Sequence, residues 1–248
     1  MAVMMVVVPT YNERENLPAF VSALFELGIP ELEILVVDDN SPDGTGQLAE
    51  SLRVQYNGRL HVLHREKKEG LGPAYLAGFR QALALGAQHI VQMDADFSHQ
   101  PHYLHTMRAM ITDYDLVLGS RFMKGGGVDE SWSVYRKALS LWANRVYTPL
   151  ILRMPIADAT GGFKAWRRET LIGMNLDRIR SNGYVFQVEM TYVAYRLGYR
   201  IGEFPIYFPD RKAGSSKMSS RVALEAALRV WQILARHAHL TPADRAVG

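Results

Sequence analysis

Short apolar runs rich in β-branched residues recur along the first half of the chain, separated by longer stretches with helical periodicity. Each interval leaves room for one crossover helix, which is typical of an α/β fold with a mostly parallel sheet flanked by helices. The runs are MVVV near residue 5, EILVV at 33–37, LHVL at 60–63, HIVQM at 89–93 and DLVLG at 115–119.

Two helix starts carry signals of their own. Asn12 followed by Glu15 predicts an N-cap with a capping box ahead of LPAFVSALFEL, and Pro101 predicts the start of a helix through HYLHTMRAMI. Beyond residue 155 the pattern predicts a strand at FKAWRR, a helix through FQVEMTYVAYRLG, a strand near RIGEFPIYF, a polar loop DRKAGSSKMSS and a last helix from about 220 to 240.

The composition fits one large domain and limits the classes of function. The 248 residues are 48% hydrophobic, and the formal charge of +3 is too small to favour nucleic acid as the main partner. The absence of cysteine excludes disulfides and thiolate metal sites, and it makes the cytoplasm the expected compartment. Because no uncharged apolar run approaches the length of a membrane span, we expect a chain that does not cross a membrane.

Polar clusters follow each of the five apolar runs. Because ligands of open parallel sheets bind beyond the carboxyl ends of the strands, we expect these clusters to share one functional edge. They are Pro9-Thr10-Tyr11, Asp38-Asp39-Asn40, Arg65 to Gly72, Asp94-Ala95-Asp96 and Gly119-Ser120-Arg121.

Two of these clusters contain candidate carboxylates. Asp94 and Asp96, one residue apart, are either turn and cap residues or ligands of Mg²⁺ or Mn²⁺, which take hard oxygen ligands and often retain substrate phosphates. Their place at the carboxyl end of a strand favours the metal site. The similar pair in Asp113-Tyr114-Asp115 precedes a strand, at the other end of the sheet, and is interpreted as structural. Within DDNSPDG, Asp38 and Asp43 are interpreted as turn and cap residues, whereas Asp39 is placed to accept from a nucleoside.

Eight segments, in order from about residue 5 to 220, resemble the dolichol-phosphate (polyprenol-phosphate) mannosyltransferases, which are GT-A-fold glycosyltransferases of family 2. The resemblance implies a single catalytic domain of GT-A (Rossmann-like) fold over 1–220. The residue pattern predicts, within it, an acceptor and interfacial segment at about 125–153 and, after it, a C-terminal amphipathic helix and tail at 221–248. The segments are PTYNERENL, VVDDNSPDGT, KKEGLGPAYLAGF, MDADFSHQP, GSRF, DATGGFKAWRR, GYVFQVEM and DRKAGSSKM.

The same resemblance implies a site for GDP-mannose. Asp94 and Asp96 match the motif for the metal and the diphosphate, and Ser98 stands where many relatives have a longer amide, so water or phosphate oxygen can fill the third ligand position. The residues implied in holding the nucleoside are Pro9, Tyr11, Glu13, Val37 and Asp39.

Three late cations are expected to act on phosphate together with Asp96. Arg121 would orient an acceptor phosphate, while Arg211 and Lys217 would close over the donor phosphates and neutralise the departing nucleoside diphosphate. A solvated pair Arg211-Lys212 is the alternative interpretation.

The chemistry of a phosphate acceptor removes the need for a base. A phosphate monoester is already ionised near neutral pH, so the site has only to desolvate and aim it, and the expected product is a β-mannosyl phosphate of inverted configuration. The sequence has no QxxRW stretch like those of polysaccharide synthases. Glu189 is either a late carboxylate near the acceptor or a paired structural acid.

A lipid acceptor requires contact with a membrane surface, so the chain is expected at the cytoplasmic face of a membrane, with or without a separate anchoring subunit. A stripe from Trp132 at helical spacing is either a core face or an interfacial helix, and its two tryptophans and flanking arginines favour the interface. The last helix is a second candidate, and His237 and His239 are expected at its surface. The stripe continues through Tyr135, Leu139, Trp142 and Val146.

Other classes remain as alternatives. A nucleotidyltransferase is disfavoured because PTYNERENL is acidic and lacks glycine. A polyprenyl-phosphate transferase for UDP-glucose or an N-acetylhexosamine, and a non-catalytic nucleotide-sugar binding protein, are not excluded by the sequence.

Overall fold

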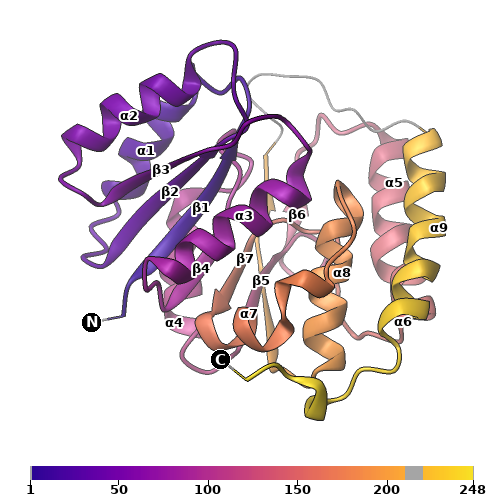
Figure 1. Cartoon of the computed structure of the whole chain (residues 1–248). Helices are drawn as coiled ribbons and strands as arrows, with labels where there is room; N and C mark the ends of the chain where they lie inside the picture. The colour runs from indigo at the N-terminus through magenta and orange to yellow at the C-terminus, as the bar shows by residue number, and fades with distance from the viewer. Residues whose placement is uncertain (1, 210–219, 248) are drawn as a thin grey trace.

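The computed structural model describes residues 2–209 and 220–247. Within them the strands form a seven-stranded sheet in the order β3-β2-β1-β4-β7-β5-β8, and a small parallel pair, β6-β9 (Figure 1). The strands are β1 (Met4–Thr10), β2 (Leu32–Asp38), β3 (Leu60–His64), β4 (His89–Gln92), β5 (Leu116–Ser120), β6 (Gly127–Val128), β7 (Lys164–Arg167), β8 (Ile201–Pro205) and β9 (Tyr207–Phe208).

The five apolar runs of the sequence are β1 to β5, and their carboxyl ends meet at one edge as predicted. β1 to β4 pair in parallel, while β7 lies between β4 and β5 and runs antiparallel to both, so β5 points the same way as β4. The FKAWRR strand was predicted, but its place and direction were not, because strand order depends on contacts between distant segments. The β6-β9 pair was also missed.

Helices cover both faces of the sheet, and alternate residues of each strand enter two separate cores. Val6 and Val8 of β1 pack with α1, α2 and α4, whereas Met5 and Val7 pack with α3 and α8. Burial on both faces explains why these strands are continuous apolar runs. The helices of this part of the fold are α1 (Leu17–Phe25), α2 (Thr45–Gln55), α3 (Leu71–Ala84), α4 (Leu104–Met110), α7 (Arg168–Met174) and α8 (Tyr184–Arg196).

The predicted capping box at Asn12 is wrong. α1 begins at Leu17 without a side-chain cap, and Asn12 has a left-handed backbone with φ of 61°. Its backbone N–H donates to Ser41 Oγ at 3.1 Å, so the segment is a turn against the loop after β2. Pro18, in the first helical turn, begins the helix instead. Pro101 opens a short 3-10 turn that leads into α4, as expected.

The segment after β6 folds into a helical run along one side of the molecule. It comprises α5 (Val134–Trp142), a π-helical turn (Ala143–Tyr147) and α6 (Thr148–Leu152). The predicted last helix is α9 (Ser220–His237), which packs against α8 and α6. α9 and α6 lie at one side of the view in Figure 1. None of the helices in the described ranges has the length and hydropathy needed to span a bilayer.

Candidate active site

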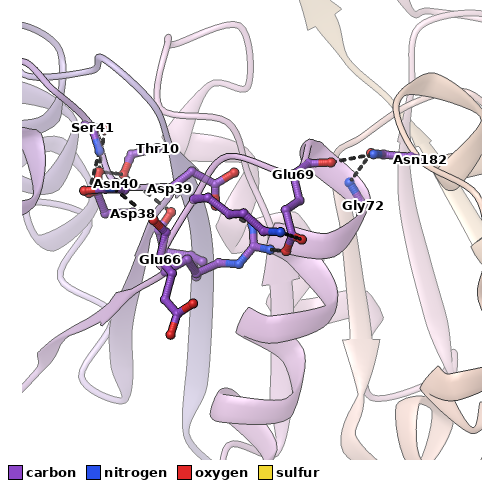
Figure 2. Close-up of polar contacts among 12 residues, drawn as sticks. Thr10, Asp38, Asp39, Asn40, Ser41, Glu66, Glu69, Gly72 and Asn182 are labelled. Atoms are coloured by element: carbon purple, nitrogen blue, oxygen red, sulfur yellow. Dashed lines mark hydrogen bonds and ion pairs between the residues drawn. The ribbon is translucent and has the colours of Figure 1, made fainter.

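The loop after β2 carries three aspartates whose contacts differ. Asp38 is buried and accepts from Ser41 Oγ at 2.6 Å and Thr10 Oγ1 at 3.1 Å, while Asp43 accepts from the backbone N–H and the hydroxyl of Thr45 at the start of α2. These contacts confirm the interpretation of Asp38 and Asp43 as turn and cap residues. Asp39 faces away from this turn (Figure 2).

Asp39 lies against the segment that follows β3. Its carboxylate forms an ion pair with Arg65, and Arg65 Nη2 also donates to Glu69 Oε2 at 2.7 Å. Burial raises the pKa of Asp39, although Arg65 offsets part of that effect. Lys68 Nζ lies 3.5 Å from the ring centre of Tyr11. Asp39 and Tyr11 therefore both contact cations of the segment that follows β3.

The other residues expected at the nucleoside differ in exposure, since Val37 is buried while Pro9 and Glu13 are partly exposed. Val37 is fully buried in the core with α3, so only its backbone lies near the edge. Pro9 pairs with it in register at the end of β1. The backbone N–H of Glu13 donates to Thr45 Oγ1 at 3.0 Å, and its side chain accepts from Asn16 at 2.9 Å.

The two aspartates after β4 are held in place by neighbouring groups. The Tyr75 hydroxyl of α3 donates to Asp94 Oδ1 at 2.9 Å, and the Asp94 backbone N–H donates to His99 Nδ1 at 3.0 Å. The Ser98 backbone N–H donates to Asp96 Oδ1 at 3.0 Å. Burial, with Asp94 nearby, raises the pKa of Tyr75, so the hydroxyl stays a donor. Both carboxylates are thus fixed in orientation.

The donor set around Asp94 and Asp96 fits a hard divalent cation. In the described ranges no group of three or more His, Cys, Asp or Glu side chains could hold a metal, so two carboxylates would be the charged protein ligands. Ser98 Oγ, beside them, is buried and has no hydrogen-bond partner among the described residues. A water ligand of the cation would satisfy such a hydroxyl.

Arg121, after β5, is bound by a buried acid. Its Nε and Nη2 donate to the two oxygens of Asp158 at 2.7 Å each, and Asp158 is fully buried in the DATGGF segment. The guanidinium carbon lies 5.3 Å from the ring centre of Phe208, and His99 packs edge-on against the same ring. Phe208 therefore packs against both Arg121 and His99, which follows the two aspartates after β4.

Lys164 and Gln187 form the centre of a second buried polar network. Lys164 of β7 is fully buried and donates to the backbone oxygen of Gln187 at 2.8 Å and to its side chain at 3.0 Å. The Gln92 side chain donates to the side-chain oxygen of Gln187 and accepts from Trp166 Nε1 at 2.7 Å. Burial lowers the pKa of Lys164 to about 7. This network could not be predicted from the sequence, because its members lie on the three separate elements β4, β7 and α8.

Glu189 is a structural acid. Its Oε2 accepts from the backbone N–H groups of Arg180 and Ser181 at 2.9 and 2.6 Å, and its Oε1 accepts from Arg236 and His237 at 2.8 Å each. This resolves the alternatives left by the sequence in favour of a paired residue. The expectation that His237 lies at the surface is wrong, because it is buried against Glu189; His239 is exposed as expected.

The apolar stripe on α5 is partly exposed. The prediction that Trp132 lies at an interface is wrong, because Trp132 is buried and packs edge-on against Phe208 of β9. Trp142 is 47% exposed and Leu150 is 71% exposed. Tyr135 and Val146 of the stripe are also exposed, as are Val134, Leu141, Leu228 and Trp231.

Several contacts of this site were not predicted. The local pattern around Tyr75 is that of a core aromatic of α3, and neither Asp158 in DATGGF nor His99 in MDADFSHQP was predicted to contact the site. The histidine in MDADFSHQP, five residues after the first aspartate, was the one available signal. Arg211 and Lys217 lie outside the described residues.

Comparison with known proteins places this arrangement among glycosyltransferases. Residues 5–173 match the family model for glycosyl transferase family 2. The chain is 46% identical over 232 residues to undecaprenyl-phosphate mannosyltransferase of Micrococcus luteus, covering 93% of this chain and 94% of that protein. It is 45% identical over 235 residues to polyprenol monophosphomannose synthase of Mycolicibacterium smegmatis, covering 94% of this chain and 88% of that protein.

Solved structures agree on the fold. Glucosyl-3-phosphoglycerate synthase from Mycobacterium tuberculosis, in complex with Mn²⁺, UDP and glucosyl-3-phosphoglycerate, matches with a TM-score of 0.63 at 18% identity, covering 96% of this chain and 80% of that one. Mannosyl-3-phosphoglycerate synthase from Rubrobacter xylanophilus matches with a TM-score of 0.62 at 17% identity, covering 95% and 73%. At such identities the likeness concerns architecture alone.

Proposed function

Because this chain belongs to glycosyl transferase family 2, we propose that it transfers mannose from GDP-mannose to a polyprenyl phosphate such as dolichyl phosphate. The expected product is the polyprenyl β-D-mannosyl phosphate, formed with inversion. The observation that carries this proposal is the similarity, over nearly the whole chain, to two proteins named for mannosyl transfer to polyprenyl phosphates.

The donor would bind along the carboxyl edge of β1, β2 and β4. Asp39, beside Arg65, offers an acceptor next to a donor, a combination that suits a base or ribose edge. Tyr11, which is 36% exposed, offers a ring face. Asp94 and Asp96 would hold Mg²⁺ or Mn²⁺, which supplies charge neutralisation for the diphosphate when bound.

The acceptor phosphate would attack without a protein base. It already carries a nucleophilic oxygen at neutral pH, and Glu189, the late carboxylate, is fully occupied by α9 and by backbone N–H groups. Arg121, which Asp158 holds in one orientation, would aim that phosphate. Arg211 and Lys217 are proposed to neutralise the leaving diphosphate.

The lipid acceptor suggests that the protein works at a membrane surface, on its cytoplasmic side. The exposed apolar residues of α5, α6 and α9 include Trp142, Leu150 and Trp231, with Arg145 also exposed on the same helical run. Aromatic and basic residues together are typical of helices that lie in the headgroup layer. A separate anchoring subunit remains a prediction.

The test is a donor screen with the purified chain. Labelled GDP-mannose, UDP-glucose or UDP-N-acetylglucosamine is incubated with a polyprenyl phosphate and Mn²⁺ or Mg²⁺, and organic-extractable label is counted. Transfer from GDP-mannose alone, abolished by chelation, supports the proposal. Transfer from a UDP-sugar instead would replace the donor, and transfer from none of them would leave a nucleotide-sugar binding protein.

A further inference from the structure

The segment 65–72, which follows β3 and enters α3, lies against the carboxylate of Asp39. Arg65 forms an ion pair with Asp39 through Nη1 and with Glu69 through Nη2. The Arg65 backbone N–H donates to the Asp38 carbonyl at 2.8 Å, and Asn40 Nδ2 donates to the Glu66 carbonyl at 3.0 Å. The position of Arg65 at the proposed donor site thus depends on the position of this whole segment.

One side chain from a distant part of the chain holds the far end of this segment. Asn182 Nδ2 donates to the Glu69 carbonyl at 2.7 Å, and Asn182 Oδ1 accepts from the Gly72 backbone N–H at 3.1 Å. Figure 2 shows Asn182 reaching both residues across the gap between the two elements. The same oxygen accepts from the Gly183 N–H at 2.7 Å, at the start of α8.

Two glycines make this close contact possible. A Cβ at Gly70 would lie 2.5 Å from Asn182 Nδ2, and a Cβ at Gly72 would lie 2.8 Å from the Ser181 carbonyl. Gly70 also has φ of 107°, a conformation that other residues rarely adopt. The glycines of KKEGLG therefore fit the surface of residues 181 and 182, which supports a specific rather than incidental contact.

The segment that carries Asn182 is itself fixed. Glu189 accepts from the backbone N–H groups of Arg180 and Ser181, and α9 supplies Arg236 and His237 to the same carboxylate. Asn182 thus projects from a stretch held by Glu189 onto the polar end of the 65–72 segment.

We propose that Asn182 is a positioning residue for donor binding, which holds the 65–72 segment so that Arg65 stays against Asp39. The inference rests on the proposed function, because it takes Asp39 as a contact of the nucleoside. Asn182 acts through Arg65 and does not itself touch the donor. Its loss would let the segment shift and would weaken nucleotide binding more than it slows transfer.

The experiment compares Asn182→Ala and Asn182→Asp with the wild-type protein in steady-state kinetics and in GDP titration calorimetry. Asn182→Ala is expected to raise the KM for the nucleotide sugar and the Kd for GDP about tenfold, with kcat within about twofold, because two hydrogen bonds to the segment are lost. Asn182→Asp keeps the acceptor for Gly183 but loses the donor to Glu69. A similar rise in KM and Kd for Asn182→Asp would show that loss of the Gly183 contact at the start of α8 does not cause the weaker binding.

Asn175→Ala is the matched control, because Asn175 caps the turn 176–178 through the same kind of amide-oxygen contact. It should lower the melting temperature without changing KM. Unchanged KM and Kd in both Asn182 variants of an active enzyme overturn the inference alone. Wild-type protein that transfers from no donor overturns the proposed function, and GDP binding that is unaffected by Asn182→Ala overturns the inference in that case too.

Discussion

Replacing Glu189 by glutamine should destabilise the fold without removing a catalytic group. The carboxylate is fully buried and accepts four hydrogen bonds, two from backbone N–H groups of residues 180 and 181 and two from Arg236 and His237 of α9. A glutamine offers one oxygen and one NH₂ group. The NH₂ group must face donors on one of the two sides, so at least one pair of contacts is lost.

The magnitude follows from the burial of these contacts. Breaking one side of a buried ion pair costs about 3–5 kcal/mol, but the Arg236 side chain is 37% exposed, so solvent screens part of its share. We expect a loss of about 3 kcal/mol in the free energy of unfolding. For a chain of this size, that corresponds to a fall of roughly 6–12 °C in melting temperature.

The assay is urea denaturation at pH 7, with Glu33→Gln as the matched control. Glu33 pairs with His61 at 2.8 Å, but both side chains are partly exposed, so its loss should cost less than about 1 kcal/mol. At saturating nucleotide sugar, transfer activity per folded Glu189→Gln molecule should stay within a few-fold of wild type. A loss of stability no larger than that of the control, or a normal melting temperature with abolished transfer, would refute the structural role.

The pH dependence gives an independent check on the same residue. Burial acts to raise the pKa of Glu189, but hydrogen bonds from His237, Ser181 and Arg180 outweigh it and lower the pKa below its ordinary 4.5. A carboxyl with a lowered pKa stabilises the fold fully above its unfolded pKa and loses that contribution as pH falls through the folded one. The stability gap between wild type and variant should therefore narrow below about pH 4.5.

Three further predictions concern the turn that carries Asp94 and Asp96, the buried Lys164 and the exposed apolar surface. Asp96→Ala should lower kcat by about a hundredfold or more with little loss of stability, measured by transfer assay and thermal melting; a melted protein would contradict this. The wild type should become more stable relative to Lys164→Met as the pH rises from 7 to about 10, because the unfolded lysine releases its proton near 10.5 and the buried one near 7. A difference in unfolding free energy, measured in urea, that stays constant over this pH range would refute the prediction. Trp142→Ala should weaken binding to anionic vesicles about fivefold, whereas the exposed Val54→Ala on α2 should not; equal binding would point to another surface.

The sequence predicted the elements whose position follows from the local hydrophobic pattern. The five apolar runs became β1 to β5, and their polar ends met at one edge, because continuous burial and crossover spacing leave few other arrangements. The predictions from sequence were wrong or incomplete where contacts between distant segments determine the structure. The turn at Asn12 is set by Ser41, and the place of β7 is set by pairing with strands far apart in the chain.

The site followed the same division. Asp94, Asp96 and Asp39 could be proposed from the sequence because residue type and strand-end position suffice to nominate them. Their partners were not, since Tyr75 and Arg65 come from other elements and nothing in their local pattern reveals the contact. Glu189 could not be assigned from the sequence for the same reason, because its partners lie about fifty residues later in α9.

The central position of β7 has a consequence for synthesis of the chain. β4 and β5 do not pair with each other, and each takes β7 as a neighbour. A nascent polypeptide that has not reached Lys164 therefore carries two open, apolar strand borders in what will become the middle of the sheet. Such borders favour intermolecular pairing, so truncated products ending before that point should aggregate, and a ribosome-bound chain would need them shielded until the missing strand emerges.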